Sequence, residues 1–305
     1  MLMVNPILRP LRSRPFQIAS ISAATLLLYS SFSTSTLHAA SMSSSAAASQ
    51  TWPVTPYTPR HQSWPYTPRD FERQDSTSDD DFYSAPRFVT HIDDAAIASL
   101  RKYYDAVLPR RGRILDFCSS WVSHYPKEVG QAAKNGELRI VGMGMNQREL
   151  AANEILNAGR ILQDLNEQPK VPVTVCEEGK GNEGLLDAST CVVSIDYLIH
   201  PAEVLSSLRE RTKEGGMVHL IISNRCFPTK AVGRWLRIDE DERLDMVGDY
   251  LHFAGWKQIE IVDLKKGPGA DEQAQEQQGG LSSFMRFMGM GGSDPLWAVR
   301  ATKGQ

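Results

Sequence analysis

The feature that most constrains the fold is a regular alternation of strand-like and helix-like segments between residues 90 and 302. Apolar, β-type runs predict strands at 113–117, 138–145, 160–166, 189–198, 217–223, 257–265 and 295–302. Helical signals fall at 90–108, 127–134, 147–156, 201–212 and 239–254. Strands that alternate with helices need crossover connections, so the sequence predicts an α/β, doubly wound, seven-stranded mixed sheet with helices on both faces.

Helix ends and strand directions can be predicted from local signals. Thr90 with Asp93 three residues later is typical of an N-terminal capping box. No helical pattern lies between the last two strands, so we expect 257–265 and 295–302 to pair antiparallel. The Gln-, Glu- and Gly-rich residues between them (266–293) are expected to be a flexible insertion, although their apolar residues could also fold over the domain. These apolar residues are Phe284, Met285, Phe287 and Met288.

The N-terminal residues have the composition of a targeting segment. The first acidic residue is Asp70, while arginines and a Ser/Ala-rich run occupy the first 50 residues. An acid-free, Arg-bearing and Ser-rich leader predicts a transit peptide at 1–50 and a mitochondrial location. A secretory signal with a cleavage site near Ala39, or a disordered tail on a cytoplasmic protein, are the alternatives. No stretch of the sequence reaches the length of a transmembrane helix.

Residues 51–86 are predicted to be a Pro-rich and acidic linker before a domain at 87–302. The motif "TPYTPR" is nearly repeated as "WPYTPR", and prolines at this density favour an extended chain. Trp52 and Trp64 could dock on the domain. The acidic run "DSTSDDD" at 75–81 is expected to be solvated.

Charge and cysteine spacing exclude some functions. A formal net charge of −3 does not suggest a general nucleic-acid binder. The four cysteines are far apart and form no CxxC pair, so we expect reduced thiols and no metal site. The oligomeric state cannot be inferred from these features.

Four motifs carry a family resemblance. They are "GRILDF" (112–117), "RIVGMGMNQREL" (139–150), "QDL" (163–165) and "VSIDYLIHPAEVLSSLRERTKEGG" (193–216). In this order they resemble the class I S-adenosylmethionine-dependent methyltransferases, and the fourth motif resembles the type 11 pattern of enzymes that act on small molecules. The resemblance covers residues 87–302.

The resemblance implies S-adenosyl-L-methionine as cofactor and a small-molecule acceptor as partner, without nucleic acid. Asp116 would lie beside the amino group of the cofactor and Asp164 near its adenine. The full set of implied cofactor-binding residues is Asp116, Cys118, Ser119, Ser120, Gly144, Met145, Asp164, Leu165 and Ser194.

Two positions depart from the family pattern. The three glycines of the family's first motif are replaced by Cys118, Ser120 and Val122, which removes the residues that best tolerate a positive φ. Gly144 stands where the family carries an acid that binds the ribose, and the nearby Asn146 could compensate weakly. We therefore expect Ser120→Leu to abolish cofactor binding and Gly144→Asp to strengthen it.

Polar residues near the expected ligand edge are substrate candidates, each with an ordinary structural alternative such as helix capping or surface exposure. They are Arg87, His91, Asp196, His200, Asn224 and Arg225. Methyl transfer depends on positioning more than on acid–base groups, so no catalytic residue can be identified from the sequence.

Three functions remain open at this stage. The first is methyl transfer to a small molecule, and the second is a non-catalytic methyltransferase-like module that acts in assembly or binding. The third, a nicotinamide-dependent oxidoreductase, is disfavoured because no GxGxxG motif follows the first strand.

Overall fold

The computed structural model describes residues 51–268 and 294–304. The predicted leader at 1–50 and most of the predicted insertion, including Phe284, Met285, Phe287 and Met288, lie outside the described residues. Within the described residues no helix is long and apolar enough to cross a membrane.

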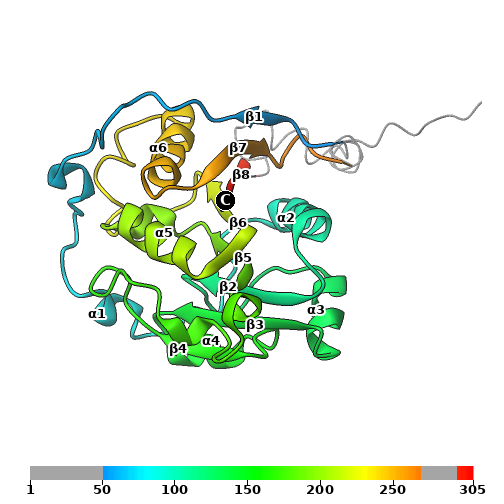
Figure 1. The fold of residues 1–305 in the computed structure, drawn as a ribbon. Coiled ribbons are helices and arrows are strands. Elements are labelled where there is room, and N and C mark those ends of the chain that lie inside the picture. The colour runs from blue at the N-terminus through cyan, green and yellow to red at the C-terminus, as the bar shows by residue number, and fades with distance from the viewer. Residues whose placement is uncertain (1–50, 269–293, 305) are drawn as a thin grey trace, which may run out of the picture. The chain divides into compact units, whose positions relative to one another are not determined.

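The sheet contains eight strands in the order β1-β7-β8-β6-β5-β2-β3-β4 (Figure 1). The strands are β1 (Val54–Pro56), β2 (Gly112–Phe117), β3 (Leu138–Gly144), β4 (Gly159–Leu162), β5 (Leu186–Val192), β6 (Thr212–Ser223), β7 (Lys257–Asp263) and β8 (Leu296–Thr302). The helices are α1 (Asp79–Tyr83), α2 (Asp94–Val107), α3 (Lys127–Lys134), α4 (Gln147–Ala152), α5 (Pro201–Glu210) and α6 (Glu240–Phe253).

The predicted strand directions are confirmed. Strands β2 to β6 run parallel to one another, and β8 lies antiparallel between β6 and β7. The sheet has one strand more than predicted because β1 pairs antiparallel with β7 at the edge. Pro56 is tolerated there because an edge strand needs no second row of hydrogen bonds.

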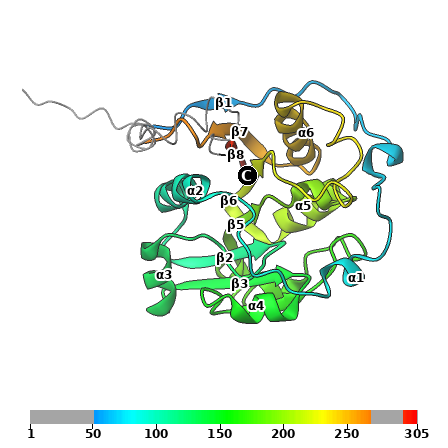
Figure 2. The same cartoon turned by 180° about the vertical axis from the view of Figure 1, so that it is seen from behind.

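Alternate residues of the strands point to two different cores. Leu115 and Phe117 of β2 belong to a cluster that includes Leu205 of α5 and Leu251 of α6. Ile114, which points the other way, belongs to a second cluster that also contains residues of α2 and α3. Figure 2 shows the consequence: α5 and α6 cover one face of the sheet, while α2 and α3 cover the other.

Several element boundaries differ from the prediction for local reasons. Helix α2 is capped by Asp93, whose side chain accepts a hydrogen bond of 2.7 Å from the Ala96 backbone N–H, and not by Thr90. Strand β4 ends at Leu162 because the chain then turns, with the Gln168 N–H donating to the Asp164 carbonyl. Strand β5 ends at Val192 because Val193 has a φ of 41°, far from the extended conformation of a regular strand.

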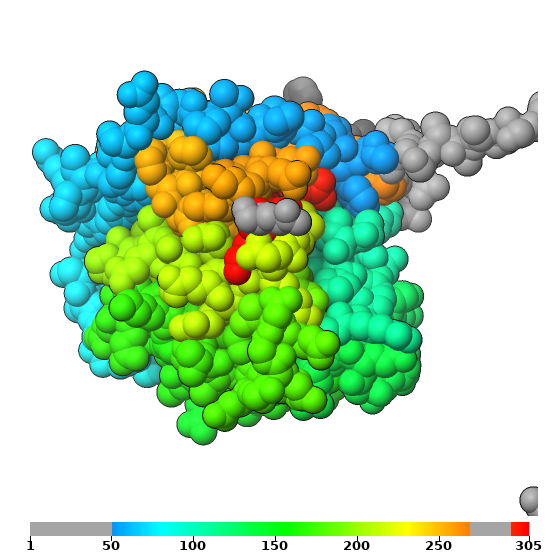
Figure 3. All heavy atoms as spheres, viewed as in Figure 1, coloured from blue at the N-terminus to red at the C-terminus, as the bar shows by residue number. Residues whose placement is uncertain are grey.

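Residues 51–86, here called the strap, differ from the linker that the sequence predicts. They carry β1 and α1 and lie along α6 and β7 (Figure 3). Both near-repeats contribute a buried tyrosine: the hydroxyl groups of Tyr57 and Tyr66 donate hydrogen bonds to the same carboxylate, Asp249 of α6. The Tyr57 ring also occupies the space where a Cβ on Gly248 would lie. The repeated Pro-Tyr-Thr-Pro-Arg motif is therefore an anchor.

The acidic run at the end of the strap is also bound to the domain. Lys230 is fully buried, and its ammonium group lies 3.3 Å from Asp75 and 3.2 Å from Asp79. Asp79 is itself 4% exposed and pairs with Arg73 at 2.7 Å. A buried ammonium group needs compensating acids, and this requirement holds the run in place.

Replacing Asp249 by Asn is expected to release the strap. The variant loses one acceptor and the charge that strengthens both tyrosine hydrogen bonds, so the free energy of unfolding should fall by about 2–4 kcal/mol. Limited proteolysis should cleave the strap faster. Asp245→Asn is the matched control, because Asp245 is partly exposed and forms a surface pair with Arg60 at 2.9 Å; it should cost less than about 1 kcal/mol. Equal effects of the two variants would contradict the anchor.

Candidate functional site

A cavity of about 330 Å³ opens at the carboxyl ends of the parallel strands. Its walls come from the loops that follow β2, β3, β4, β5 and β6, and from the end of the strap. The strand order reverses between β2 and β5, and ligands of doubly wound sheets bind in the crevice at such a point. The volume falls within the range of small-molecule sites.

Most of the residues predicted from the sequence line this cavity. They are Arg87, His91, Asp116, Cys118, Ser119, Ser120, Gly144, Met145, Asp164, Leu165, Ser194 and Arg225. The remaining three candidates lie elsewhere. Asn224 is exposed and does not line the cavity, His200 lines a separate groove against the strap, and Asp196 is buried in the core.

The turn after β2 contains a positive φ at a residue that is not glycine. Cys118 has a φ of 51°, in the left-handed region that costs a non-glycine residue roughly 1–2 kcal/mol. The next N–H, that of Ser119, is 2.8 Å from the Met143 carbonyl and donates to it. The turn therefore bends over the end of β3.

This bend explains why residue 144 is glycine. A Cβ on Gly144 would lie 2.1 Å from the Ser119 carbonyl oxygen, and backbone cannot yield as a flexible side chain does. The expectation that Gly144→Asp strengthens binding is therefore wrong. The turn fills the space where an acidic side chain would begin, so the two departures from the family pattern are one structural change.

Asp116 lies beneath the turn and is almost fully buried. Its carboxylate accepts hydrogen bonds from the hydroxyl groups of Ser119 and Ser123, both at 2.6 Å, and from Thr190 at 3.2 Å. Burial raises the pKa of Asp116 to about 6, against the lowering effect of these hydroxyl groups. The three hydroxyl groups fix the turn to the sheet through this one carboxylate.

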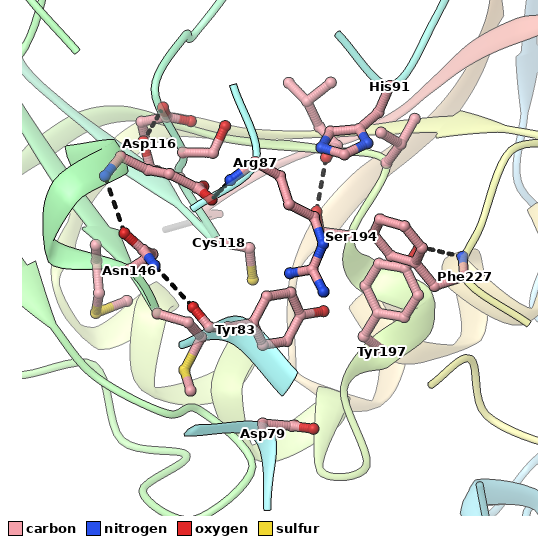
Figure 4. Close-up of a pocket in the computed structure, with 18 of the residues that line it drawn as sticks. Asp79, Tyr83, Arg87, His91, Asp116, Cys118, Asn146, Ser194, Tyr197 and Phe227 are labelled. Atoms are coloured by element: carbon pink, nitrogen blue, oxygen red, sulfur yellow. Dashed lines mark hydrogen bonds between the residues drawn. The ribbon is translucent and has the colours of Figure 1, made fainter. Parts of the chain in front are cut away.

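Asn146 is fully used in the structure and is not free to replace the missing acid. Its side-chain oxygen accepts hydrogen bonds from the N–H groups of Arg148 and Glu149 and so caps α4. Its amide nitrogen donates to the carbonyls of Tyr83 and Ser84 at 2.7 and 3.1 Å. Asn146 therefore joins the strap to the end of β3 (Figure 4).

The other predicted cofactor residues line the cavity in less constrained ways. Asp164 follows β4, and burial raises the pKa of its carboxyl group. Its side chain accepts from the Asn166 N–H at 2.7 Å, and the next residue, Leu165, is buried. Ser194 donates to the Val192 carbonyl at 2.8 Å. Met145 follows directly after β3.

The segment that follows the strap supplies basic side chains to the cavity. The Arg87 backbone N–H donates to Glu149 at 2.6 Å, and the guanidinium group donates to the Phe82 carbonyl at 2.9 Å. His91 follows on the same segment, and burial together with the Arg87 charge lowers the pKa of its imidazole. Arg225 also lines the cavity and pairs with Asp294 at 2.8 Å.

Two further lining residues have strained backbones. His124 has a φ of 56° and Val193 a φ of 41°, and a β-branched residue rarely adopts the latter value. Burial lowers the pKa of His124 to about 4, and its Nδ1 atom is buried without a hydrogen-bond partner among the described residues. Strain of this kind is concentrated at ligand sites.

Sequence reasoning missed several cavity residues. Asp79 was hidden in a run interpreted as a solvated linker, and Glu149 in the exposed-looking part of an amphipathic helix. His124, Tyr197 and Phe227 adjoin motifs that were identified, but no periodicity or spacing marked them. A metal is not indicated by the geometry, since residues 51–268 and 294–304 contain no group of three or more His, Cys, Asp or Glu suited to hold one.

No protein-family model matches this sequence, and no curated protein is similar to it in sequence. Solved structures that resemble the chain include phosphoethanolamine N-methyltransferase 2 of Haemonchus contortus in complex with S-adenosyl-L-methionine, at 15% identity and a TM-score of 0.40. That match covers 67% of this chain and 53% of the other, so the chain spans about half the length of that enzyme.

Two more solved structures resemble the chain to a similar degree. A methyltransferase from Archaeoglobus fulgidus has 12% identity and a TM-score of 0.42, covering 69% of this chain and 95% of its own. The [4+2]-cyclase SpnF has 14% identity and a TM-score of 0.44, covering 74% and 91%. At this level of similarity the comparisons carry no argument, and the fold assignment rests on the strand order of the chain itself.

Gly144→Ala tests the close contact with Ser119. The added Cβ forces the turn and β3 apart, so the free energy of unfolding should fall by about 1–3 kcal/mol. Gly130→Ala is the matched control: its Cβ would meet only the end of the Ile155 side chain at 3.3 Å, and α3 should gain helix propensity. Chemical unfolding of both variants is the measurement. A Gly144→Ala protein as stable as the Gly130→Ala protein would contradict the contact.

Asp196 is expected to make the free energy of unfolding depend on pH. Burial raises the pKa of this carboxyl group to about 7, and its Oδ2 atom has no partner among the described residues. The neutral form stabilises the fold below about pH 4, and this contribution is lost as the pH rises through 7. Relative to Asp196→Asn, the wild type should lose up to about 4 kcal/mol of unfolding free energy between pH 4 and pH 8. A difference that does not change with pH would disprove this assignment.

Proposed function

We propose that the protein transfers a methyl group from S-adenosyl-L-methionine to a small molecule. The observation that carries this proposal is the cavity at the switch point between β2 and β5, lined by the residues on which the methyltransferase resemblance falls. Bound there, the cofactor supplies an electrophilic methyl group on a sulfonium sulfur.

The residues at the cavity fit this cofactor, except that no carboxylate stands at residue 144 to bind its ribose. Asp164 and Leu165 offer a carboxylate and an apolar contact on the adenine side, beside Met145. The turn at Cys118 and Ser120 borders the same cavity, and Asp116 gives it a negative charge from below once ionised. The side chains of Gly144 and Asn146 provide no ribose contact, so affinity should be weaker than a carboxylate grip would give.

The chain's own contribution is positioning. The hydroxyl network on Asp116 fixes the turn, and the contact of Asn146 with the strap fixes the opposite wall. Such fixed walls hold two reactants in line and exclude water, which is the main requirement of a displacement at carbon.

A non-catalytic module is the second candidate. It is favoured by one observation: the Ser119 carbonyl closes the position from which a ribose-binding acid would reach the cofactor. The location of the cavity and its strained walls favour the enzyme, because a purely structural module has no need to retain them.

Titration of the full chain with S-adenosylmethionine and S-adenosylhomocysteine separates the two candidates. We expect measurable binding by the wild type, and loss of at least tenfold in affinity for Ser120→Leu, because the larger side chain enters the cavity. Arg139→Gln, at an exposed position of β3 away from the cavity, is the control and should bind as the wild type does. Absence of binding by folded wild type at millimolar cofactor would refute the enzyme and support the module.

A further inference from the structure

The Arg87 guanidinium group lies in an aromatic enclosure. Its central carbon is 4.5 Å from the ring centre of Phe82, 5.5 Å from that of Phe227 and 5.8 Å from that of Tyr83. Figure 4 shows the group pointing into the cavity between Tyr83 on one side and Tyr197 and Phe227 on the other. Rings enclose a cation well but accept no strong hydrogen bonds from it.

The hydrogen bonds of this guanidinium group are incomplete. Its Nη1 atom is buried and has no partner among the described residues, and no ion pair of Arg87 is formed within them. Burial raises the pKa of Glu149 against the lowering effect of Arg87, and this carboxylate accepts the backbone N–H of Arg87 instead of the guanidinium group. A buried charged donor without an acceptor is costly, and native proteins retain one mainly where a ligand completes it.

The other basic side chains at the cavity offer no free charged donor. Burial lowers the pKa of His91, which favours its neutral form, and Arg225 is already paired with Asp294 at 2.8 Å. Arg87 is therefore the lining cation whose guanidinium group has an open donor in the part of the chain that the structure describes. A guanidinium group with a free edge is suited to a carboxylate, which it can hold with two parallel hydrogen bonds.

The walls of the enclosure are fixed in place. The Tyr197 and Phe227 rings lie 6.0 Å apart and tilted, and the Tyr197 hydroxyl accepts the Phe227 N–H at 2.8 Å. The Tyr197 carbonyl also accepts from Asn166 at 3.0 Å, and the Tyr83 carbonyl accepts from Asn146 at 2.7 Å, so the loops after β3 and β4 hold the same rings. The enclosure therefore offers flat, fixed walls to a ligand.

We infer that the methyl acceptor is a small planar carboxylic acid, whose carboxylate pairs with Arg87 and whose ring packs against Tyr83, Tyr197 and Phe227. This inference rests on the proposed function. The carboxylate is the anchor and not the nucleophile, because pairing with a guanidinium group withdraws its electron density. A second group of the same molecule, a hydroxyl or amine, forms the bond to the methyl carbon. The carbon–sulfur bond breaks with its electron pair on sulfur, and the proton of the hydroxyl or amine leaves to solvent.

The test measures binding of planar acids to the full chain in the presence of S-adenosylhomocysteine. Benzoate, 4-hydroxybenzoate and cinnamate are compared with their neutral amides in the wild type, Arg87→Gln, Arg87→Lys and the control Arg139→Gln. We expect the wild type and the control to prefer at least one acid over its amide by tenfold or more. Arg87→Gln should lose this preference, and Arg87→Lys should keep part of it, because a lysine retains the charge without the planar edge. Unfolding temperatures show whether each variant is folded.

The cofactor measurements distinguish the inference from the proposed function. Affinity for S-adenosylhomocysteine should change less than twofold in Arg87→Gln. If that affinity falls while binding of 5′-methylthioadenosine, which lacks the carboxylate, is unchanged, Arg87 holds the cofactor and the inference is overturned. Equal binding of acids and amides by the wild type, or no binding of either, also overturns it. Acid binding that depends on Arg87 in a protein that binds no S-adenosylhomocysteine would refute the proposed function alone and leave the anion site standing.

Discussion

The close passage of the Ser119 carbonyl over Gly144 is the contact on which the site depends. It places the turn after β2 across the end of β3, where the Ser119 N–H reaches the Met143 carbonyl. Asp116 then holds the turn from below through Ser119 and Ser123. A side chain at residue 144 and this path of the turn are mutually exclusive, so the loss of the family's glycines and the loss of its ribose-binding acid belong together.

The strap completes the site from outside the sheet. Two tyrosines on Asp249 fix its first half, and Lys230 fixes its acidic second half. The residues that follow form a wall of the cavity, where Arg87 is held by Phe82 and Glu149. Asp249 of α6 and Lys230 of the loop after β6 therefore help to determine where Arg87 lies at the cavity.

The two buried acids, Asp116 and Asp196, have different environments. Asp116 is satisfied by hydroxyl groups and holds the turn, whereas Asp196 has one oxygen without a partner among the described residues and does not line the cavity. Neither is free to bind an acceptor. Among the described residues that line the cavity, the buried polar atoms without a partner belong instead to Arg87 (Nη1) and His124 (Nδ1).

The sequence by itself determined the fold class, because apolar periodicity and the order of strands and helices require a doubly wound sheet. It also determined the antiparallel pair β7 and β8, and the loops that line the cavity, because all parallel strands end at one edge. Only the tertiary structure decided which side chains are free there. His200 and Asp196 follow β5 but do not line the cavity, because His200 lies in the groove against the strap and Asp196 is buried. The sequence of a loop does not reveal the direction in which its side chains point.

The strap also combines a feature that is visible in the sequence with contacts that only the tertiary structure decides. Its repeated motif was visible, yet its anchoring depends on Asp249 and Lys230, which lie more than 150 positions further along the chain. Contacts between residues so far apart are fixed by packing and by the cost of burying unpaired charge, and no local pattern encodes them. In the same way, the reason for a glycine at residue 144 is visible only in the structure, where the Ser119 carbonyl occupies the space of a side chain.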